Sequence, residues 1–127
     1  MRVYIAAPWV RKADAIMAGW DVEAAGHTVT SRWFHHGDGG DAMDSSGITQ
    51  PIGNIREQAW EDIEDVCGSD VLVVLNLEKS EGKAVETGIA LIQNIPVISV
   101  GKRGNIFQTL AIEVETLQEA IAALDRL

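Results

Sequence analysis

The distribution of apolar positions predicts strands and helices that alternate along the chain. Short runs rich in apolar and β-branched residues, typical of buried strands, occur at residues 3–7, 27–34, 70–75, 95–100 and 113–114. Segments with apolar residues three and four positions apart, typical of helices, occur at residues 13–25, 54–66, 82–93 and 116–127. Because strands that alternate with helices form parallel sheets, the pattern predicts an α/β fold.

The run from Asp70 to Leu75 is apolar at nearly every position, as expected for a strand covered on both faces. We therefore expect a single doubly wound five-stranded parallel sheet, flavodoxin-like or Rossmann-like, with helices on both faces. By analogy with other five-stranded doubly wound folds, we expect the strand order 2-1-3-4-5. The chain has 127 residues, so residues 1–127 are expected to form one domain.

Apolar spacing also predicts helix faces and helix ends. In the first predicted helix the apolar stripe consists of Ile16, Met17, Trp20 and Ala24. Gly26 follows where a left-handed residue commonly ends a helix.

The second predicted helix follows a long segment without apolar periodicity. We expect Asn54 to cap this helix, and its inward residues to be Ile55, Ala59, Ile63 and Val66.

Residues 35–53 contain five glycines, one proline and three aspartates, and are predicted to form a long loop. Loops of this length in compact domains are uncommon and are more often functional or mobile than without a role. Its potential metal ligands match no recognised spacing, so we expect no metal: His35, His36, Asp38, Asp41 and Asp44.

Composition narrows the possible partners. Lys plus Arg is 10 and Asp plus Glu is 19, a net charge of -9, which argues against nucleic-acid polymers but permits a small anionic ligand. The single Cys67 excludes an internal disulfide and a cysteine-based metal cluster. The short apolar stretch at the N-terminus predicts neither a signal peptide nor a membrane span, so we expect a cytoplasmic protein without a membrane partner.

Common nucleotide-binding and hydrolase motifs are absent. No GxGxxG follows the first predicted strand, and no Walker or GxSxG pattern occurs. We therefore expect no cofactor.

Polar segments follow several of the predicted strands. In doubly wound sheets, ligands bind beyond the carboxyl ends of the strands. The segments expected at that edge are Pro8–Lys12, the residues from Trp33 onward, Asn76–Glu86 and Gly101–Asn105.

The helix that begins near Ser80 and Gly82 carries the strongest candidate. Its first amides are free to bind an anion. Glu86 follows within about one turn, where we expect the helix N-terminus to keep it ionised and available as a nucleophile or base. An equally good interpretation is that Glu86 only stabilises the helix dipole.

Asp62, on the preceding helix, is the second candidate. It lies in the sequence REQAWEDIEDV, near the end of the long loop. The alternative is a solvated acidic face, because several acidic residues surround it: Glu57, Glu61, Glu64 and Asp65.

These segments also carry recognisable motifs. They are VYIAAP at 3–8, Arg-x-x-Ala-x-x-Asp-Ile at 56–63, SDVLVVLN at 69–76, and SEGKAVETGIALxxxIPVI at 80–98. With them the chain resembles, nearly end to end, the nucleoside 2-deoxyribosyltransferase family in the broad sense that includes the nucleoside 5′-monophosphate N-glycosidases. GHTVTSRW at 26–33 and GKRGNIF at 101–107 resemble small phage and bacterial members.

The resemblance implies roles for particular residues. Glu86 matches the catalytic glutamate that attacks C1′ of the sugar, and Asp62 matches an acid that helps to hold the sugar. Tyr4 matches an aromatic residue near the nucleophile. Ser80 matches a position that is acidic in deoxyribosyltransferases and a phosphate-binding serine in monophosphate glycosidases. Asn105 resembles a residue contributed to a neighbouring subunit's site.

Other residues at the same edge are expected to bind the substrate: Gly82, Pro8, Trp9, Arg11 and Trp33. The two tryptophans could stack on a base, although large aromatic residues more often belong to a core or an interface. Arg11, Lys12 and Lys83 could join Ser80 as phosphate donors. Lys83 departs from the family pattern, which often has a small residue there.

The leading hypothesis is an enzyme that cleaves and transfers the N-glycosidic bond of 2′-deoxynucleosides through a glutamate nucleophile, as a homodimer or higher homo-oligomer. One alternative is a nucleoside 5′-monophosphate N-glycosidase, which is a hydrolase. Another is a non-catalytic nucleotide-binding module, because such folds host many functions.

Overall fold

A computed structural model describes residues 1–35, 43–44, 47–48 and 52–127. Its main sheet has five parallel strands in the order β2-β1-β5-β6-β7. The strands are β1 (Arg2–Ala6), β2 (Thr28–Val29), β5 (Val71–Leu75), β6 (Val97–Val100) and β7 (Ile112–Val114). This is the predicted order 2-1-3-4-5, so the predicted fold class is confirmed.

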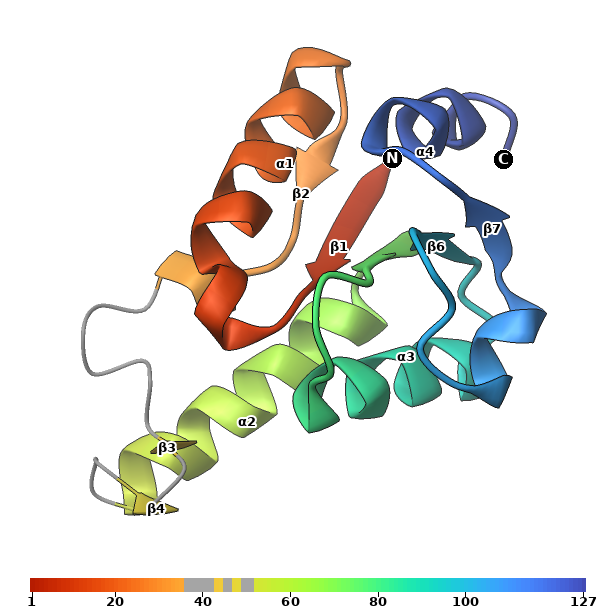
Figure 1. Ribbon diagram of the computed structural model, residues 1–127. Helices are drawn as coiled ribbons and strands as arrows, with labels where there is room; N and C mark the ends of the chain where they lie inside the picture. The colour runs from red at the N-terminus through yellow and green to blue at the C-terminus, as the bar shows by residue number, and fades with distance from the viewer. Residues whose placement is uncertain (36–42, 45–46, 49–51) are drawn as a thin grey trace.

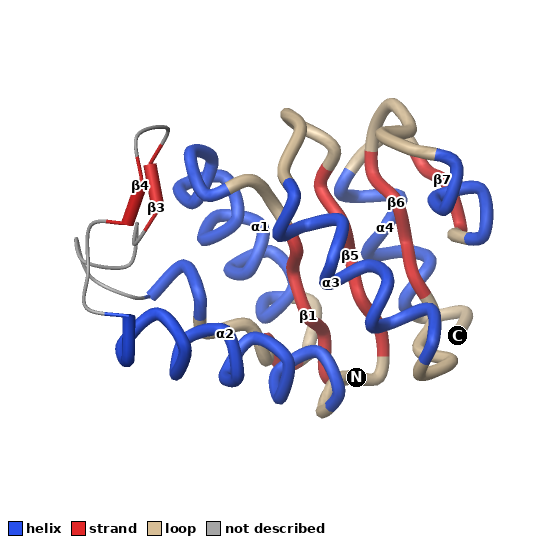
Figure 2. Tube along the Cα trace, turned by 90° about the horizontal axis from the view of Figure 1, so that it is seen from below, coloured by secondary structure: helices blue, strands red, loops and turns tan. Residues whose placement is uncertain are grey.

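Four α-helices cover the two faces of this sheet. They are α1 (Lys12–Ala24), α2 (Ile52–Cys67), α3 (Glu81–Ile92) and α4 (Leu117–Leu124). Figures 1 and 2 show α2 and α3 side by side on one face, with α1 and α4 on the other. None of the helices in the described residues is long and apolar enough to cross a membrane.

The two central strands form the core. Val3 to Ala6 of β1 and Val71 to Leu75 of β5 are buried, with Tyr4 opposite Leu72 in the parallel register. Strands in this position are covered by helices on both sides, which explains why β5 has no polar residue. The side chains of β1 that point toward α2 and α3, Tyr4 among them, can therefore reach the candidate site.

The second strand is much shorter than predicted. β2 ends at Val29, and the short helix η2 (Trp33–His35) follows. The Thr30 amide still donates to the Val3 carbonyl at 2.8 Å, and beyond Thr30 side chains replace backbone pairing with β1. Ser31 Oγ accepts from the Ile5 amide at 2.6 Å, and Trp33 Nε1 donates to the Ile5 carbonyl at 2.8 Å. The prediction of a strand over residues 27–34 was therefore wrong at its end.

Of the predicted apolar stripe of helix α1, Ile16 packs against the core, but the stripe that faces the sheet is otherwise different. Met17 is 58% exposed and Trp20 is 64% exposed. The buried residues are Ala15, Ala18, Gly19 and Val22. The helix lies so close to the sheet that a Cβ on Gly19 would be 3.7 Å from the side chains of both Ile5 and Val29, so small residues take this face. Gly26 has the predicted left-handed conformation, with φ 93°.

Helix α2 begins before its predicted cap. It includes Ile52 and Gly53, so Asn54 lies inside the helix and does not cap it. Of the residues predicted to point inward, Val66 is buried, but Ala59 is exposed.

The predicted loop at residues 35–53 lies largely outside the described residues. Within its limits the structure describes His35, a short antiparallel pair formed by β3 (Met43–Asp44) and β4 (Gly47–Ile48), and the start of α2.

Candidate active site

The site lies where β1 and β5 end and where α2 and α3 run side by side. Residues from both helices and from the segment after β1 line a cavity of about 160 Å³. Its lining residues are Ala7, Trp9, Trp33, Gln58, Asp62, Ser80, Gly82, Lys83 and Glu86. The structure thus brings together six of the predicted site residues: Trp9, Trp33, Asp62, Ser80, Gly82 and Glu86.

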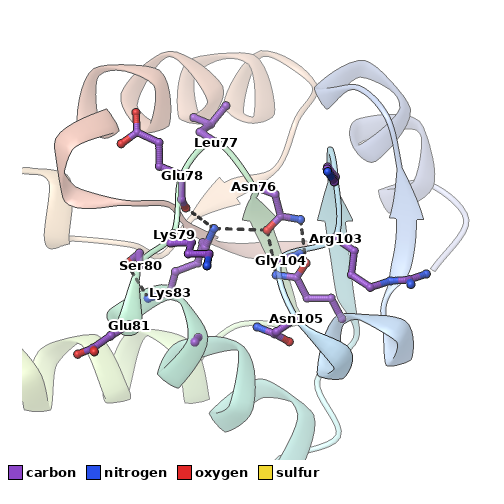
Figure 3. Close-up of a pocket in the computed structure, with 13 residues that line it drawn as sticks. Asn76, Leu77, Glu78, Lys79, Ser80, Glu81, Lys83, Arg103, Gly104 and Asn105 are labelled. Carbon is purple, nitrogen blue, oxygen red and sulfur yellow. Dashed lines mark hydrogen bonds between the residues drawn. The ribbon is translucent and has the colours of Figure 1, made fainter.

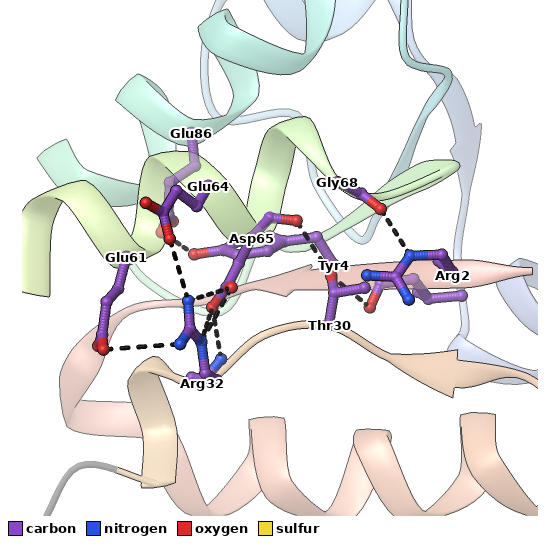
Figure 4. Close-up of polar contacts among 10 residues, drawn as sticks. Arg2, Tyr4, Thr30, Arg32, Glu61, Glu64, Asp65, Gly68 and Glu86 are labelled. Carbon is purple, nitrogen blue, oxygen red and sulfur yellow. Dashed lines mark hydrogen bonds and ion pairs between the residues drawn. The ribbon is translucent and has the colours of Figure 1, made fainter.

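A hydrogen bond joins Glu86 to the core of the sheet. Tyr4 projects from β1, is fully buried, and donates its hydroxyl proton to Glu86 Oε2, as Figure 4 shows. Burial, followed by the negative charges of Glu86 and Asp62, raises the pKa of Tyr4, so this hydroxyl remains a donor. Because one carboxylate oxygen is held, the other can face a ligand in the cavity.

Glu86 does not have the low pKa that its place on α3 suggested. Burial is the largest effect, and it raises the pKa of Glu86 to about 8; the Tyr4 hydrogen bond lowers it and the charge of Asp62 raises it. Glu86 is the sixth residue of α3, and the favourable effect of a helix N-terminus falls off within the first turn. The expectation that Glu86 stays ionised at neutral pH was therefore wrong.

Asp62 faces the same cavity from α2. It is half-buried, and its negative charge acts on both Glu86 and Tyr4. Gln58 lies four residues earlier on α2, and one helical turn therefore places both side chains on the same face. A ligand in the cavity would meet a carboxylate from each of two helices.

Two aromatic rings form another wall of the cavity. The ring centroids of Trp9 and Trp33 are 6.0 Å apart, with their planes inclined by 53°. Trp33 is buried and fixed through its indole N–H, whereas Trp9 is half-buried and has Lys12 Nζ 4.8 Å from its ring centroid. This wall offers an apolar surface to a planar group.

The start of α3 closes the cavity with polar groups. Ser80 caps the helix, and its hydroxyl oxygen accepts from the Lys83 amide at 3.2 Å. Lys83 is buried, and its Nζ donates to the Glu78 carbonyl at 2.7 Å and to Asn76 Oδ1 at 3.4 Å. Burial lowers the pKa of Lys83.

Three predicted substrate-binding residues lie away from this cavity. Pro8 is buried at the start of η1 (Trp9–Arg11) and does not line it. Arg11 pairs instead with Asp14 at 2.7 Å and with Glu78 at 3.4 Å. Asn105 precedes η4 (Ile106–Leu110), where its side chain accepts from the backbone amide of the second residue of η4. It lines a neighbouring cavity.

Ala7 and Gln58 line the cavity but were not predicted to do so. Gln58 could have been found from its spacing of four residues before Asp62 on one helix face. Ala7 could not have been found from the sequence in this way, because it contributes to the cavity only by having a small side chain just after β1.

Several solved structures resemble this one. No protein-family model matches the sequence, and no curated protein matches it. A 2-deoxyribosyltransferase from Bacillus psychrosaccharolyticus has a TM-score of 0.70 and 18% identity, with 95% of this chain and 90% of that chain covered. A conserved protein from Enterococcus faecalis V583 has a TM-score of 0.70 and 17% identity, with 100% and 99% covered.

A third similar structure is a CMP N-glycosidase from Clostridium botulinum, with a TM-score of 0.57, 16% identity and 100% of both chains covered. The chain shares its fold with all three. In each case the alignment covers almost the whole domain, so the shared fold includes the strands and helices that carry Tyr4, Asp62 and Glu86.

Proposed function

We propose that this chain is a member of the nucleoside 2-deoxyribosyltransferase family in the broad sense. It cleaves the N-glycosidic bond of a 2′-deoxynucleoside, or of its phosphorylated form, and transfers the sugar to another base. The support comes from the sequence motifs together with two neighbours in fold, a 2-deoxyribosyltransferase and a CMP N-glycosidase.

The observation that carries the proposal is the arrangement of Glu86, Asp62 and Tyr4. Two carboxylates from different helices face one cavity, and a buried tyrosine holds one oxygen of Glu86. Cleavage at C1′ has an oxocarbenium-like transition state, which an adjacent carboxylate stabilises and can trap covalently.

In the first step Glu86, in its ionised form, attacks C1′ through Oε1, the oxygen that Tyr4 does not hold, while the bond from C1′ to the base nitrogen breaks. The base leaves with the bonding electron pair and takes up a proton from water, and the sugar remains as an ester of Glu86. In the second step a nitrogen of an incoming base attacks C1′ and loses its proton to water, the ester bond breaks, and the Glu86 carboxylate is regenerated. Asp62 holds the sugar through both steps, and the developing positive charge on the sugar favours the ionised form of Glu86.

Hydrolysis is a second candidate. It is favoured by Ser80 and Lys83, because these polar groups suit a 5′-monophosphate, the substrate that the N-glycosidases of the family hydrolyse. In this case water takes the place of the incoming base in the second step. The two outcomes differ in how well the cavity excludes water.

The test is incubation with a panel of deoxynucleosides and their 5′-phosphates, with and without an acceptor base, followed by chromatography. Transfer predicts an exchanged nucleoside whenever an acceptor base is present. Hydrolysis predicts free base and free sugar under both conditions. Nucleotide binding by calorimetry without any base released over hours would contradict both, and would favour a binding module.

A further inference from the structure

A larger cavity lies next to the Glu86 cavity and shares Ser80 and Lys83 with it. Its volume is about 580 Å³. The segments that follow β5 and β6 form its walls, with residues 76–81, 83–84, 102–105 and 108 (Figure 3). It therefore continues the candidate active site along the carboxyl edge of the sheet.

Positive charge is concentrated at this larger cavity. The chain has four lysines, and three of them line it: Lys79, Lys83 and Lys102. Glu78 and Glu81 also line it, but their carboxylates extend away from Lys83 in Figure 3, and that of Glu78 lies 3.4 Å from Arg11. In a chain with a net charge of -9, this local excess of lysine favours an anionic ligand.

Lys83 is buried, and no charged group of the described residues pairs with it. It is 6% exposed, and its Nζ donates only to neutral oxygens, those of the Glu78 backbone and the Asn76 side chain. Among the residues that the structure describes, no carboxylate lies within ion-pairing distance of it. A buried ammonium without a counter-ion is costly, and an anion from a ligand would supply the missing charge.

The neutral partners of Lys83 are themselves fixed. Asn76 Nδ2 donates to Ser99 Oγ at 2.8 Å and to Gln108 Oε1 at 2.9 Å, and Gln108 Nε2 donates back to Asn76 Oδ1 at 2.9 Å. Gln108 Oε1 also accepts from the Gly104 amide at 2.8 Å. Because this network joins β5, β6 and η4, the ammonium is held in place before any ligand arrives.

We propose that the larger cavity binds the phosphate end of the substrate, and that the substrate is a nucleoside carrying two or more phosphates. This rests on the proposed function, which places the sugar at Glu86. The base then meets the wall of Trp9 and Trp33, and the phosphates extend past Ser80 to Lys83. The cavity is within the size range of sites that hold entire drug-sized ligands, about 300 to 1,000 Å³, so it exceeds what one phosphate needs.

The first experiment measures binding to the Glu86→Gln variant, which removes the proposed nucleophile and so separates binding from turnover. Each of the four common 2′-deoxynucleosides is titrated by calorimetry beside its 5′-monophosphate and its 5′-diphosphate. We expect the affinity to rise from the nucleoside to the monophosphate and again to the diphosphate, with the diphosphate at least roughly tenfold tighter than the nucleoside, because each phosphate adds charge-assisted hydrogen bonds. A diphosphate that binds no more tightly than the monophosphate overturns the proposal.

The second experiment assigns the effect to Lys83. Lys83→Met keeps much of the length of the side chain and removes its charge, and Arg126→Gln, at the exposed end of the chain, is the control for net charge. We expect Lys83→Met to weaken diphosphate binding roughly tenfold and nucleoside binding by much less, and Arg126→Gln to change neither. An equal loss for the nucleoside and the diphosphate contradicts the assignment.

If Lys83→Met does not fold, as judged by its thermal transition, the double variant Lys79→Met/Lys102→Met carries the test. Both of these lysines line the same cavity and are exposed. We expect the double variant to lose diphosphate affinity selectively, and unchanged affinity overturns the proposal.

Base release by the unmodified protein separates this inference from the proposed function. Tight diphosphate binding with no base released from any compound contradicts the proposed function and leaves the phosphate site standing. Base release from nucleosides, with no gain in affinity from phosphates, supports the proposed function and overturns the phosphate site.

Discussion

Glu86 and Asp65 are both carboxylates on the face covered by α2 and α3, but their partners differ in charge. Asp65 is 9% exposed and is held by Arg32, whose Nε and Nη2 donate to it at 2.9 to 3.1 Å and whose backbone amide donates at 3.1 Å. Glu86 receives a hydrogen bond from Tyr4, a neutral donor. Figure 4 shows the two arrangements next to each other.

This difference distinguishes a carboxylate held in an ion pair from the proposed nucleophile. The guanidinium of Arg32 compensates the charge of Asp65 and ties the segment after β2 to α2, where Thr30 also donates to the Asp65 carbonyl at 3.2 Å. The uncompensated Glu86 has a pKa of about 8 and faces a cavity. A buried carboxylate with a neutral donor is suited to chemistry, since a developing positive charge in a ligand stabilises its ionised form.

The largest effect is expected for Glu86, the proposed nucleophile. Glu86→Gln should lower base release by at least about 10³-fold, because it removes the proposed nucleophile and keeps the size of the side chain. Glu64→Gln is the matched control, since Glu64 is exposed, lies 3.6 Å from Arg32 and lines neither of the two cavities described above. The rates are measured by chromatography of the released base. Near-full activity in Glu86→Gln would remove Glu86 from the nucleophile role.

The raised pKa of Glu86 also predicts a pH-dependent loss of stability. Between about pH 4.5 and pH 8 the unfolded chain has an ionised Glu86 while the folded chain keeps it protonated. Folding therefore takes up a proton in this range. As the pH rises through it, Glu86 lowers the free energy of unfolding. Urea unfolding of Glu86→Gln should show a stability gain over the unmodified protein that grows from pH 5 to pH 9, at most on the order of 4 kcal/mol. A constant difference across this range would contradict the raised pKa.

Activity should follow the same ionisation in the opposite direction. If the ionised carboxylate attacks C1′, kcat/KM should rise about tenfold per pH unit below pH 8 and level off above it. Rates of base release from pH 5.5 to pH 9.5 measure this profile. A plateau that begins near pH 5 would show that Glu86 is as acidic as an exposed glutamate.

Tyr4→Phe sharpens the role of the neutral donor. Loss of the hydrogen bond that lowers the pKa of Glu86 should move the rising limb of the pH profile to higher pH. At pH 7 we expect roughly a tenfold loss of kcat/KM, and a smaller loss at pH 9.5. A purely structural role for Tyr4 predicts the same loss at both pH values.

The smallest effect is expected for Asp65, the carboxylate that is paired with Arg32. Asp65→Asn should lower the free energy of unfolding by about 1 to 3 kcal/mol, because it weakens charge-assisted hydrogen bonds to Arg32. Base release per folded molecule should stay unchanged. The two quantities are measured by urea unfolding and chromatography, and a loss of turnover without a loss of stability would contradict the division between the two carboxylates.

The fold was predictable because the sequence patterns that specify it extend over many residues. The continuous apolar run of β5 can only be buried on both faces, and its alternation with helices specified the sheet. The errors fall where short-range patterns compete. In α1, Met17 and Trp20 follow helical spacing as well as Ala18 and Val22 do, and only the closeness of the sheet at Gly19 selects the small residues.

Several residues that line the candidate site were predictable from the sequence, but the electrostatics of the site were not. Their positions near the predicted strand ends and within the sequence motifs made Glu86, Asp62 and Ser80 candidates, and these three residues line one cavity. The position of Glu86 on its helix suggested an ionised carboxylate, but burial raises its pKa more than the helix N-terminus lowers it. Burial of this kind depends on the packing of α2 against α3, which is a property of the tertiary structure. For the same reason the sequence could not show which predicted phosphate donor lacks a carboxylate partner. Arg11 is paired with Asp14, whereas Lys83 has no carboxylate partner among the described residues.

The placement of the tryptophans gives the protein an optical reporter of its own. Trp9 and Trp33 line the cavity that contains Glu86, whereas Trp20 and Trp60 are 64% and 61% exposed. Replacing the two exposed indoles with phenylalanine would leave fluorescence that comes from the cavity wall alone. A base that stacks there would quench this emission, so ligand entry and product release could be followed in real time without a label.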